Sequence, residues 1–433
     1  MLFSNISIID ENQNVRENMY VGVKGKKTAY VGAVKPRGDY GRIYDGRDKL
    51  LMSAFYNAHG HTPMTLLRGV GENMNLQDWL NKYVFPFEAN LTGEAVYWGT
   101  LLGIAEGLRF GIVSTTDMYF LCSDIAKAYD EAKVKGNISR AVTCFTDENL
   151  RDLDSFKESR DLFKNFHNSS GGRIKIDMSL HAEYTSTPKI VRQLAEYTKE
   201  TGANMHVHVS ETKFEHEECK KRHNGKTPAA YLSGLGLFDA QTTAAHCVWL
   251  EDGDIKILKE KGVTAASCPV SNLKLGSGVC NAAKLKAAGV NVAIGTDGAA
   301  SNNSLNFVEE MKFFSLLQKG IFTAPAAASP RETLFAATRA GALSQGRADC
   351  GLLKEGFAAD LIILDLNKPN MNPRADLAAN AVYSACGADV ILTMCDGEVL
   401  YENGEYKTID IEKTIAETEK ATGNILNKLA GKK

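Results

Sequence analysis

The chain has 433 residues, more than one ordinary domain, and its 44% hydrophobic content can supply a large buried core. The formal net charge of −2, with no basic block of the kind that tracks a phosphate backbone, argues against a nucleic-acid partner. Nine scattered cysteines without a CxxC pair, no export signal and no run of ~20 apolar residues predict a cytoplasmic protein without membrane association.

The first fifty residues read as a small β unit. Short strands separated by turns are expected at residues 2–9, 20–23 and 28–31. These residues are assigned to the first part of a β-sandwich.

From residue 51 the pattern changes to apolar strands that alternate with amphipathic helical stretches. Eight strands are expected, at residues 51–61, 111–118, 140–145, 174–181, 203–209, 242–248, 263–269 and 290–296. Helices between them are expected at residues 155–166, 188–201 and 252–261. The order predicts an α/β fold, a (β/α)₈ TIM barrel over residues 51–350, whose active site lies at the C-terminal ends of the strands.

After the barrel the chain returns to strand-like runs. Two of them, at residues 359–364 and 389–394, precede a turn at Asp396-Gly397. We expect residues 351–410 to pair with the N-terminal strands as the second part of the small β-sandwich domain, which is thus built from both termini. Residues 411–433 are predicted to hold a charged amphipathic helix, at 411–429.

Polar residues that can bind a metal end the predicted barrel strands: His59, His61, His208, Glu211, His246 and Asp297. Alternate side chains of a strand share a face, so His59 and His61 can bind one ion together, and Gly60 is expected to leave room for it. Three imidazoles and one carboxylate would suit zinc, less often iron, and keep a position open for water. An open position indicates catalysis.

Other histidines and cysteines receive structural roles. Buried cysteine is commonly inert. Cys247 and Cys268 are therefore expected to be part of the core. The histidines in charged segments are expected to be solvated: His167, His216 and His223.

Six motifs together point to one family. They are NAHGHTPMTLLRG at 57–69, HVHVSET at 206–212, AHC at 245–247, CPVSNLKL at 268–275, GTDGAASNN at 295–303 and GLLKEGFAAD at 351–360. Nearly end to end, the chain resembles the amidohydrolase superfamily, in the branch of S-adenosylhomocysteine, methylthioadenosine and related adenosine-type deaminases, close to the chlorohydrolases. The resemblance implies a hydrolase that converts an adenosine-type nucleoside to its inosine analogue and ammonia.

The resemblance also implies roles for the strand-end residues. Four would bind the metal: His59, His61, His208 and Asp297. His206 and His208 look like a second HxH pair, but the family uses only the later histidine, so the resemblance gives His206 a structural role. Glu211 and His246 would handle protons around the attacking water, which fits the chemistry of a carboxylate base and an imidazole near a developing oxyanion. Two-metal relatives carry a carboxylated lysine at the end of the fourth strand, where this chain has Ser179-Leu180-His181, so we predict one divalent ion.

Substrate contacts follow from the same resemblance. Glu88 would bind ribose hydroxyls, His181 the purine, and Arg140 the distal part of the substrate. The family's second arginine has no clear counterpart, because the next segment is shorter and more acidic and offers only Arg151. We expect a small-molecule nucleoside as substrate and a homo-oligomer as the assembly.

Two alternatives stay open at this level. The first is guanine or 8-oxoguanine deamination, or s-triazine dechlorination, on the same scaffold, although guanine deaminases usually carry a glutamine where this chain has Pro63-Met64. The second is a non-catalytic binding or assembly protein, which would typically lack metal ligands, and none is missing here.

Overall fold

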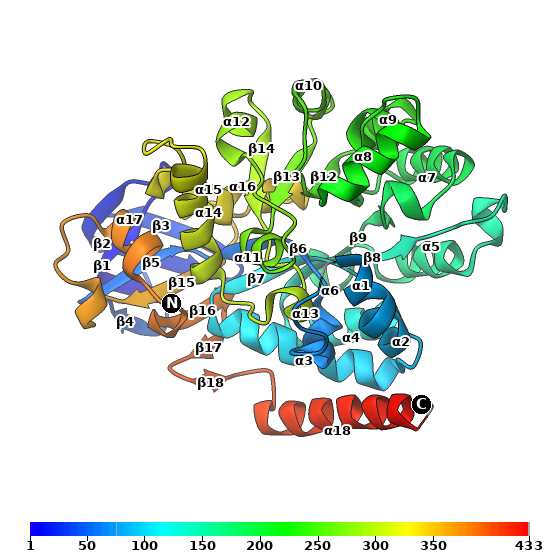
Figure 1. Ribbon diagram of the computed structural model, residues 1–433. Coiled ribbons are helices and arrows are strands. Elements are labelled where there is room, and N and C mark those ends of the chain that lie inside the picture. Colours follow the sequence, from blue (N-terminus) through cyan, green and yellow to red (C-terminus); the bar gives the residue numbers. More distant parts are fainter. Residues whose placement is uncertain (75, 432–433) are drawn as a thin grey trace.

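The computed structural model describes residues 1–74 and 76–431, which form a barrel and a separate terminal sheet (Figure 1). The barrel strands are β6 (Phe55–Gly60), β7 (Ile112–Tyr119), β8 (Lys135–Val142), β9 (Ile174–Ile176), β10 (Met178–Leu180), β11 (Met205–Val209), β12 (Thr242–His246), β13 (Thr264–Ser267) and β14 (Asn291–Ile294). They pair in parallel in the order β14-β13-β12-β11-β10-β8-β7-β6, and β9 adds to β8. A parallel bridge between Gly60 and Asp297 links the two ends. The predicted (β/α)₈ TIM barrel is confirmed.

Two of the predicted barrel strands have other bounds than expected, and a third is interrupted. Residues 51–53 belong to β5 (Lys49–Ser53) of the terminal sheet, and only β6 enters the barrel. The third strand begins at Lys135 rather than at 140, because its polar N-terminal half is buried and paired and so lacks an apolar pattern. The fourth is split at Asp177, whose carboxylate accepts hydrogen bonds from the Asn137 amide at 2.9 and 3.1 Å.

Helices cover the outside of the barrel (Figure 1). The main ones are α3 (Gly93–Arg109), α4 (Cys122–Ala132), α5 (Asp154–Phe166), α7 (Pro188–Thr201), α8 (Lys213–Arg222), α10 (Asp252–Glu260), α14 (Phe307–Ile321) and α15 (Pro330–Ala337). The three predicted helices, α5, α7 and α10, are confirmed to within one residue at each end. Helix α7 illustrates why: Thr187 caps its first turn, Pro188 sits at its first position, and Gly202 ends it with a φ of +68°.

The terminal sheet joins both ends of the chain. Its strands are β1 (Leu2–Ile9), β2 (Val15–Lys24), β3 (Lys27–Gly32), β4 (Ile43–Asp45), β5, β15 (Leu361–Asp365), β16 (Val390–Cys395), β17 (Glu398–Glu402) and β18 (Glu405–Tyr406). Strand β5 pairs in parallel with β1 and antiparallel with β15, so the expected pairing of early and late strands is confirmed. Alternate apolar side chains of these strands form a core distinct from that of the barrel. The domain boundaries at residues 50 and 350 stay predictions.

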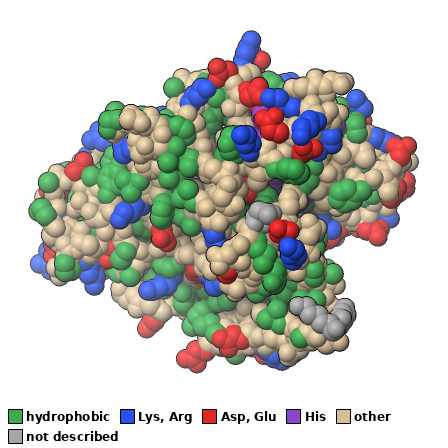
Figure 2. Space-filling view, viewed as in Figure 1, with side chains coloured by type: hydrophobic (Ala, Val, Ile, Leu, Met, Phe, Trp, Pro, Cys, Tyr) green, Lys and Arg blue, Asp and Glu red, His purple; other side chains and the backbone are tan. Residues whose placement is uncertain are grey.

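The C-terminal helix α18 (Ile411–Ala430) lies along α3 (Figure 1), where Thr418 Oγ1 donates to the carbonyl of Trp98 at 3.2 Å. Acidic and basic side chains are interspersed over the face shown in Figure 2. None of the helices in the described ranges combines the length and the apolar character that crossing a bilayer requires.

Candidate active site

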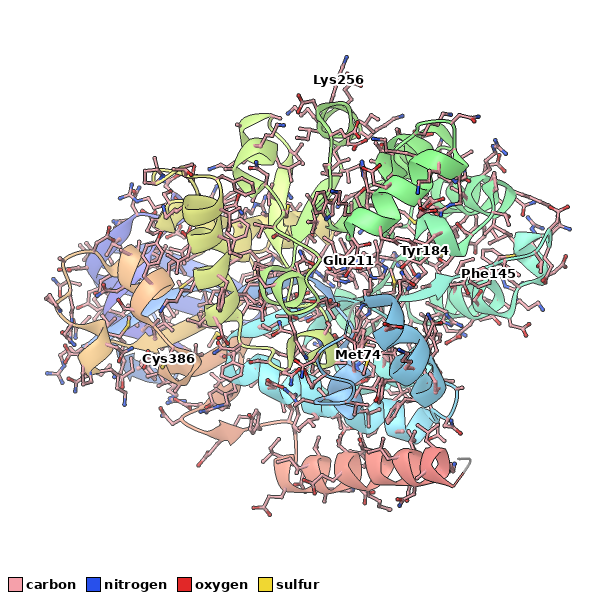
Figure 3. All side chains as sticks on the ribbon, in the orientation of Figure 1. Met74, Phe145, Tyr184, Glu211, Lys256 and Cys386 are labelled. Atoms are coloured by element: carbon pink, nitrogen blue, oxygen red, sulfur yellow. The ribbon has the colours of Figure 1, made fainter. Side chains whose placement is uncertain are left out.

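A pocket opens at the C-terminal ends of the barrel strands. Its floor is lined by His61, His208, Glu211, His246 and Asp297. Its wall is mostly apolar, and the short helices α1 (Leu76–Trp79) and α2 (Phe85–Glu88) contribute much of it. The pocket holds about 1260 Å³ free of protein atoms, its open mouth included, which is ample for a small organic ligand. Figure 3 shows Glu211 and Tyr184 near the middle of the molecule and Phe145 farther out.

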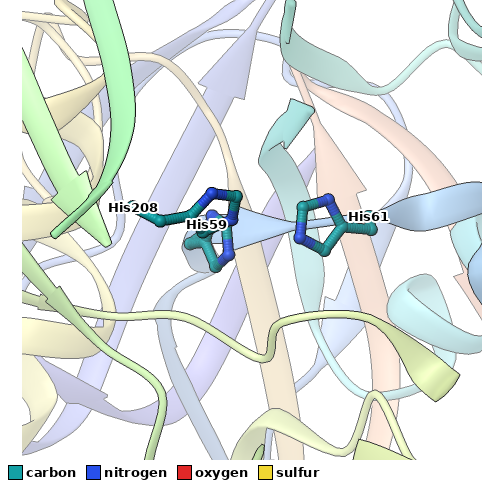
Figure 4. A group of neighbouring side chains, drawn as sticks. All are labelled: His59, His61 and His208. Carbon is teal, nitrogen blue, oxygen red and sulfur yellow. The ribbon is translucent and has the colours of Figure 1, made fainter. Parts of the chain in front are cut away.

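Three of the histidines predicted to bind metal converge on this floor (Figure 4). Ring nitrogens of His59, His61 and His208 all lie within 4.8 Å of one another. The Nδ1 atoms face other groups: that of His61 contacts the Met118 carbonyl at 2.5 Å, and that of His208 the His181 carbonyl at 2.7 Å. A carbonyl can only accept, so each Nδ1 carries the proton and each Nε2 keeps its lone pair for a cation.

The donor set fits a divalent metal ion. His59 Nε2 is buried without a hydrogen-bond partner, which is costly for a polar atom unless a ligand binds there. Asp297 Oδ1 lies 3.4 Å from His59 Nε2 and 3.3 Å from His61 Nε2. Three imidazole nitrogens and one carboxylate oxygen are ligands typical of zinc and of similar borderline cations.

Asp297 is held by several donors. Its Oδ2 accepts from Ser271 Oγ at 2.6 Å and from Ser301 Oγ at 2.9 Å. Although burial opposes ionisation, the neighbouring imidazoles hold the pKa of this carboxyl well below its usual range. Gly295 lets the end of β14 approach β6, since a Cβ there would lie 2.9 Å from the Cβ of His59.

Glu211 and His246 form a second pair on the floor. Glu211 Oε2 lies 3.7 Å from His246 Nε2, and the Asn272 side-chain oxygen accepts a hydrogen bond from His246 Nδ1 at 2.9 Å. Burial raises the pKa of Glu211. Burial opposes protonation of His246, but Glu211 and Asp297 outweigh it and raise the pKa of this imidazole. The pair is therefore suited to exchange protons with a substrate.

The three predicted substrate-binding residues, Glu88, His181 and Arg140, also line the pocket. Burial raises the pKa of Glu88 to about 7, while nearby Tyr119 and Arg140 oppose the rise. Burial lowers the pKa of His181 to about 4, so its ring is neutral, with Nδ1 3.2 Å from Thr185 Oγ1. A neutral imidazole can both donate and accept hydrogen bonds.

Arg140 lines the pocket but is already paired. Its Nε donates to Glu158 Oε2 at 3.0 Å and its NH1 to the Ala141 carbonyl at 2.7 Å, and its guanidinium lies 4.4 Å from the Phe120 ring centre. Arg151 is exposed and is not among the residues of the pocket wall. Arg140 is thus the one of these two arginines that lines the pocket.

Two expectations about neighbouring residues need correction. His216 is buried rather than solvated, because its ring bridges Ser210 Oγ at 3.4 Å and Glu251 Oε1 at 3.2 Å. The space beside Gly60 does not face the metal ligands, since a Cβ there would meet Thr115 and Asn57.

Some residues of the site were missed in the sequence. Ser271 and Asn272, which hold Asp297 and His246, fall in a motif that marked the family but suggested no role. His206, assigned a structural role, contacts His59 Nδ1 through its Nε2 at 2.9 Å. Glu215, whose carboxylate lies under Glu211, carried no pattern of its own. These roles depend on contacts between strands that no local pattern records.

Similarity to known proteins identifies the family to which this chain belongs. The model of the amidohydrolase family matches residues 50–400. The chain therefore belongs to the amidohydrolase family.

Several relatives refine this class. The chain is 38% identical to a 5-methylthioadenosine/S-adenosylhomocysteine deaminase of Caldanaerobacter subterraneus, an alignment covering 98% of each protein. It is also 38% identical to a 5′-deoxyadenosine deaminase of Methanothermobacter thermautotrophicus, with 92% of each covered. The crystal structure of an adenosine deaminase from Xanthomonas campestris with bound zinc superposes with a TM-score of 0.92, at 28% identity and 98% coverage of both chains.

Proposed function

We propose that this protein removes the amino group of adenosine-type nucleosides by metal-dependent hydrolysis, giving the inosine analogue and ammonia. The observation that carries the proposal is the convergence of three imidazoles and one carboxylate beside the Glu211–His246 pair. Relatives named as deaminases of methylthioadenosine, S-adenosylhomocysteine and 5′-deoxyadenosine support the same substrate class.

Four residues would hold one divalent cation: His59, His61, His208 and Asp297. When bound, the cation supplies the Lewis acidity that makes water a nucleophile at neutral pH. Zinc is favoured over iron by the ligand set and by the zinc bound in the structurally similar adenosine deaminase. The fourth strand ends at Leu180, followed by His181, and this end carries no lysine to bridge a second ion, which supports a single ion.

The remaining steps are proton transfers by this chain's own residues. Glu211 accepts a proton from the attacking water and returns it to the ring nitrogen beside the amino-bearing carbon. His246 carries a proton on Nδ1, because Asn272 offers an oxygen there, and directs Nε2 toward the oxygen entering at that carbon. The second proton of the water, still on the entering oxygen, is then transferred to the amino group, so that the C–N bond breaks and ammonia leaves as the carbonyl forms.

The pocket suggests how the nucleoside is held. His181, next to the metal ligands, would contact the purine, and the ionised Glu88 would accept hydrogen bonds from the two ribose hydroxyls. Arg140 would face the 5′ substituent, although Glu158 already neutralises its charge. A cytoplasmic location and a homo-oligomeric assembly stay predictions.

The alternatives are weaker. A chlorohydrolase, TrzN of Arthrobacter aurescens, superposes with a TM-score of 0.91, but at 20% identity this likeness speaks for the fold alone. A non-catalytic role would not account for the complete ligand set with its unpartnered His59 nitrogen.

A panel assay tests the proposal. The purified, metal-loaded protein is incubated separately with adenosine, 5′-deoxyadenosine, methylthioadenosine, S-adenosylhomocysteine, guanine and an s-triazine, and ammonia or chloride release is measured. We expect ammonia from at least one adenosine derivative, in equal molar amount with its inosine analogue. Release from guanine or the triazine alone would replace the proposed substrate class.

A further inference from the structure

The carboxylate beneath Glu211 has no role in the mechanism above. We infer that Glu215 is a positioning residue that aims the Glu211 side chain into the pocket. The inference rests on the proposed function, because it assigns Glu211 the proton transfers of that reaction.

Glu215 makes an unusual set of hydrogen bonds. It is the third residue of α8, whose N-cap Thr212 accepts a hydrogen bond from the Glu215 backbone N–H at 3.1 Å. In a capping box the glutamate at this place bonds back to the N–H of the cap residue itself. Here its two oxygens reach past the cap, to the N–H of Ser210 at 2.9 Å and of Glu211 at 2.7 Å.

The segment held in this way has a strained backbone. Ser210 adopts a φ of +50°, which L side chains rarely adopt and which persists only where surrounding contacts enforce it. The Glu215 carboxylate, which is buried, fixes both N–H groups at this turn. Loss of one of these bonds would free the turn to relax and rotate the Glu211 side chain.

The same turn is tied to the strand that carries His246. The Ser210 carbonyl accepts hydrogen bonds from the N–H groups of Val248 at 3.1 Å and Trp249 at 2.9 Å. These residues follow His246, which has a φ of +71°. Glu215 thus supports a turn that connects the segment of Glu211 to the segment of His246, the two residues that handle protons. Glu215 itself is not among the residues that line the pocket.

The test compares kcat and KM. In Glu215→Gln the side chain keeps its shape, but its NH₂ group would face a backbone N–H, so one of the two bonds is lost. Displacement of a catalytic group by ~1 Å can cost ~100-fold in rate, so we expect kcat to fall by ~10- to 100-fold. KM should change less than about threefold, and bound metal should stay at the wild-type ratio, since neither the pocket wall nor the ligands change.

A matched control separates positioning from general destabilisation. Asp10 is also buried and accepts hydrogen bonds from two backbone N–H groups, those of Asn12 and Asn14, both at 2.9 Å, but in the terminal sheet. Asp10→Asn makes the same acid-to-amide change and should leave kcat unchanged. If Glu215→Gln does not fold, Glu215→Asp keeps the charge but withdraws it by one methylene, and the same fall in kcat is expected.

A double substitution decides whether Glu215 acts through Glu211. In the Glu211→Gln background, Glu215→Gln should produce no further fall in kcat, because the group it positions is already gone. Additive losses, or wild-type kcat in Glu215→Gln, would overturn the inference. If the wild-type protein deaminates no adenosine derivative, the proposed function itself fails, and the two failures are distinguishable.

Discussion

Two places in this molecule bury charged groups, and they treat them differently. Where the barrel meets the terminal sheet, Lys135 Nζ lies 2.6 and 2.7 Å from the two oxygens of Asp360 and also contacts Asp396, while Tyr56 donates to Asp360. Burial opposes its protonation, yet these carboxylates raise the Lys135 pKa. Each charge at the junction thus has its counter-charge.

The pocket floor shows the opposite arrangement. His59 Nε2 has no hydrogen-bond partner although it is fully buried, and Asp297 is the nearest carboxylate. Unpaired buried polar atoms are rare and costly, so such an atom calls for a ligand. Burial of charge alone therefore does not mark a functional site. Here the mark is an unpartnered ring nitrogen within a cluster of metal-binding groups, since buried polar atoms elsewhere, such as Thr28 Oγ1 of the terminal sheet, also lack partners.

Removal of a metal ligand should have the largest effect. In His208→Ala one imidazole of the donor set is lost, so bound metal and deamination should fall together, with the rate reduced by at least ~10³-fold. Metal analysis and ammonia release measure the two quantities. His167→Ala, which removes a histidine outside the pocket, is the control and should keep both. Full activity in His208→Ala would contradict the assignment of His208 as a metal ligand.

Removal of the Lys135 charge should lower the free energy of unfolding and leave the catalytic rate nearly unchanged. Lys135→Met leaves the buried Asp360 without a cation, which typically destabilises a fold by ~3–5 kcal/mol. Denaturant unfolding should show this loss, whereas kcat per folded molecule should stay near the wild-type value. A selective loss of kcat with unchanged stability would show that the junction acts on the site.

The proposed ribose contact should depend on pH. Because burial raises the Glu88 pKa to about 7, the carboxylate that accepts both hydroxyls is populated only as pH rises through about 7. KM should therefore fall as pH rises from 6 to 8. In Glu88→Gln this dependence should vanish and KM should rise by ~10-fold, the equivalent of ~1.4 kcal/mol for weakened hydrogen bonds. A Glu88→Gln enzyme with wild-type KM at pH 8 would exclude the contact.

The smallest effect is expected at Arg140. Its guanidinium is paired with Glu158, so Arg140→Leu should change KM for 5′-deoxyadenosine less than about twofold. Only a substrate with a carboxylate in its 5′ tail should lose affinity, by a few-fold. Steady-state kinetics with 5′-deoxyadenosine and S-adenosylhomocysteine measure the difference, and equal losses on both would contradict a role at the 5′ end.

The barrel, the pairing of the terminal segments, three of the barrel helices and the C-terminal helix could be predicted from the sequence, because apolar periodicity and capping residues act locally. The start of β8 could not, since Lys135 and Asn137 are buried only through distant partners, Asp360 and Asp177. His59 and His61 could be identified because the HxH spacing places both side chains on the same face of a strand. The role of Glu215 could not be identified, because it depends on hydrogen bonds from backbone N–H groups that precede the helix cap.

We propose that the floor residues hold one metal ion that serves deamination of an adenosine-type nucleoside. The most direct test titrates metal-free protein with zinc while conversion of 5′-deoxyadenosine to its inosine analogue is followed by absorbance. We expect activity to rise linearly with added zinc and to saturate at about one zinc per chain. Conversion that needs no metal, or no conversion of any adenosine derivative at full metal occupancy, would contradict it.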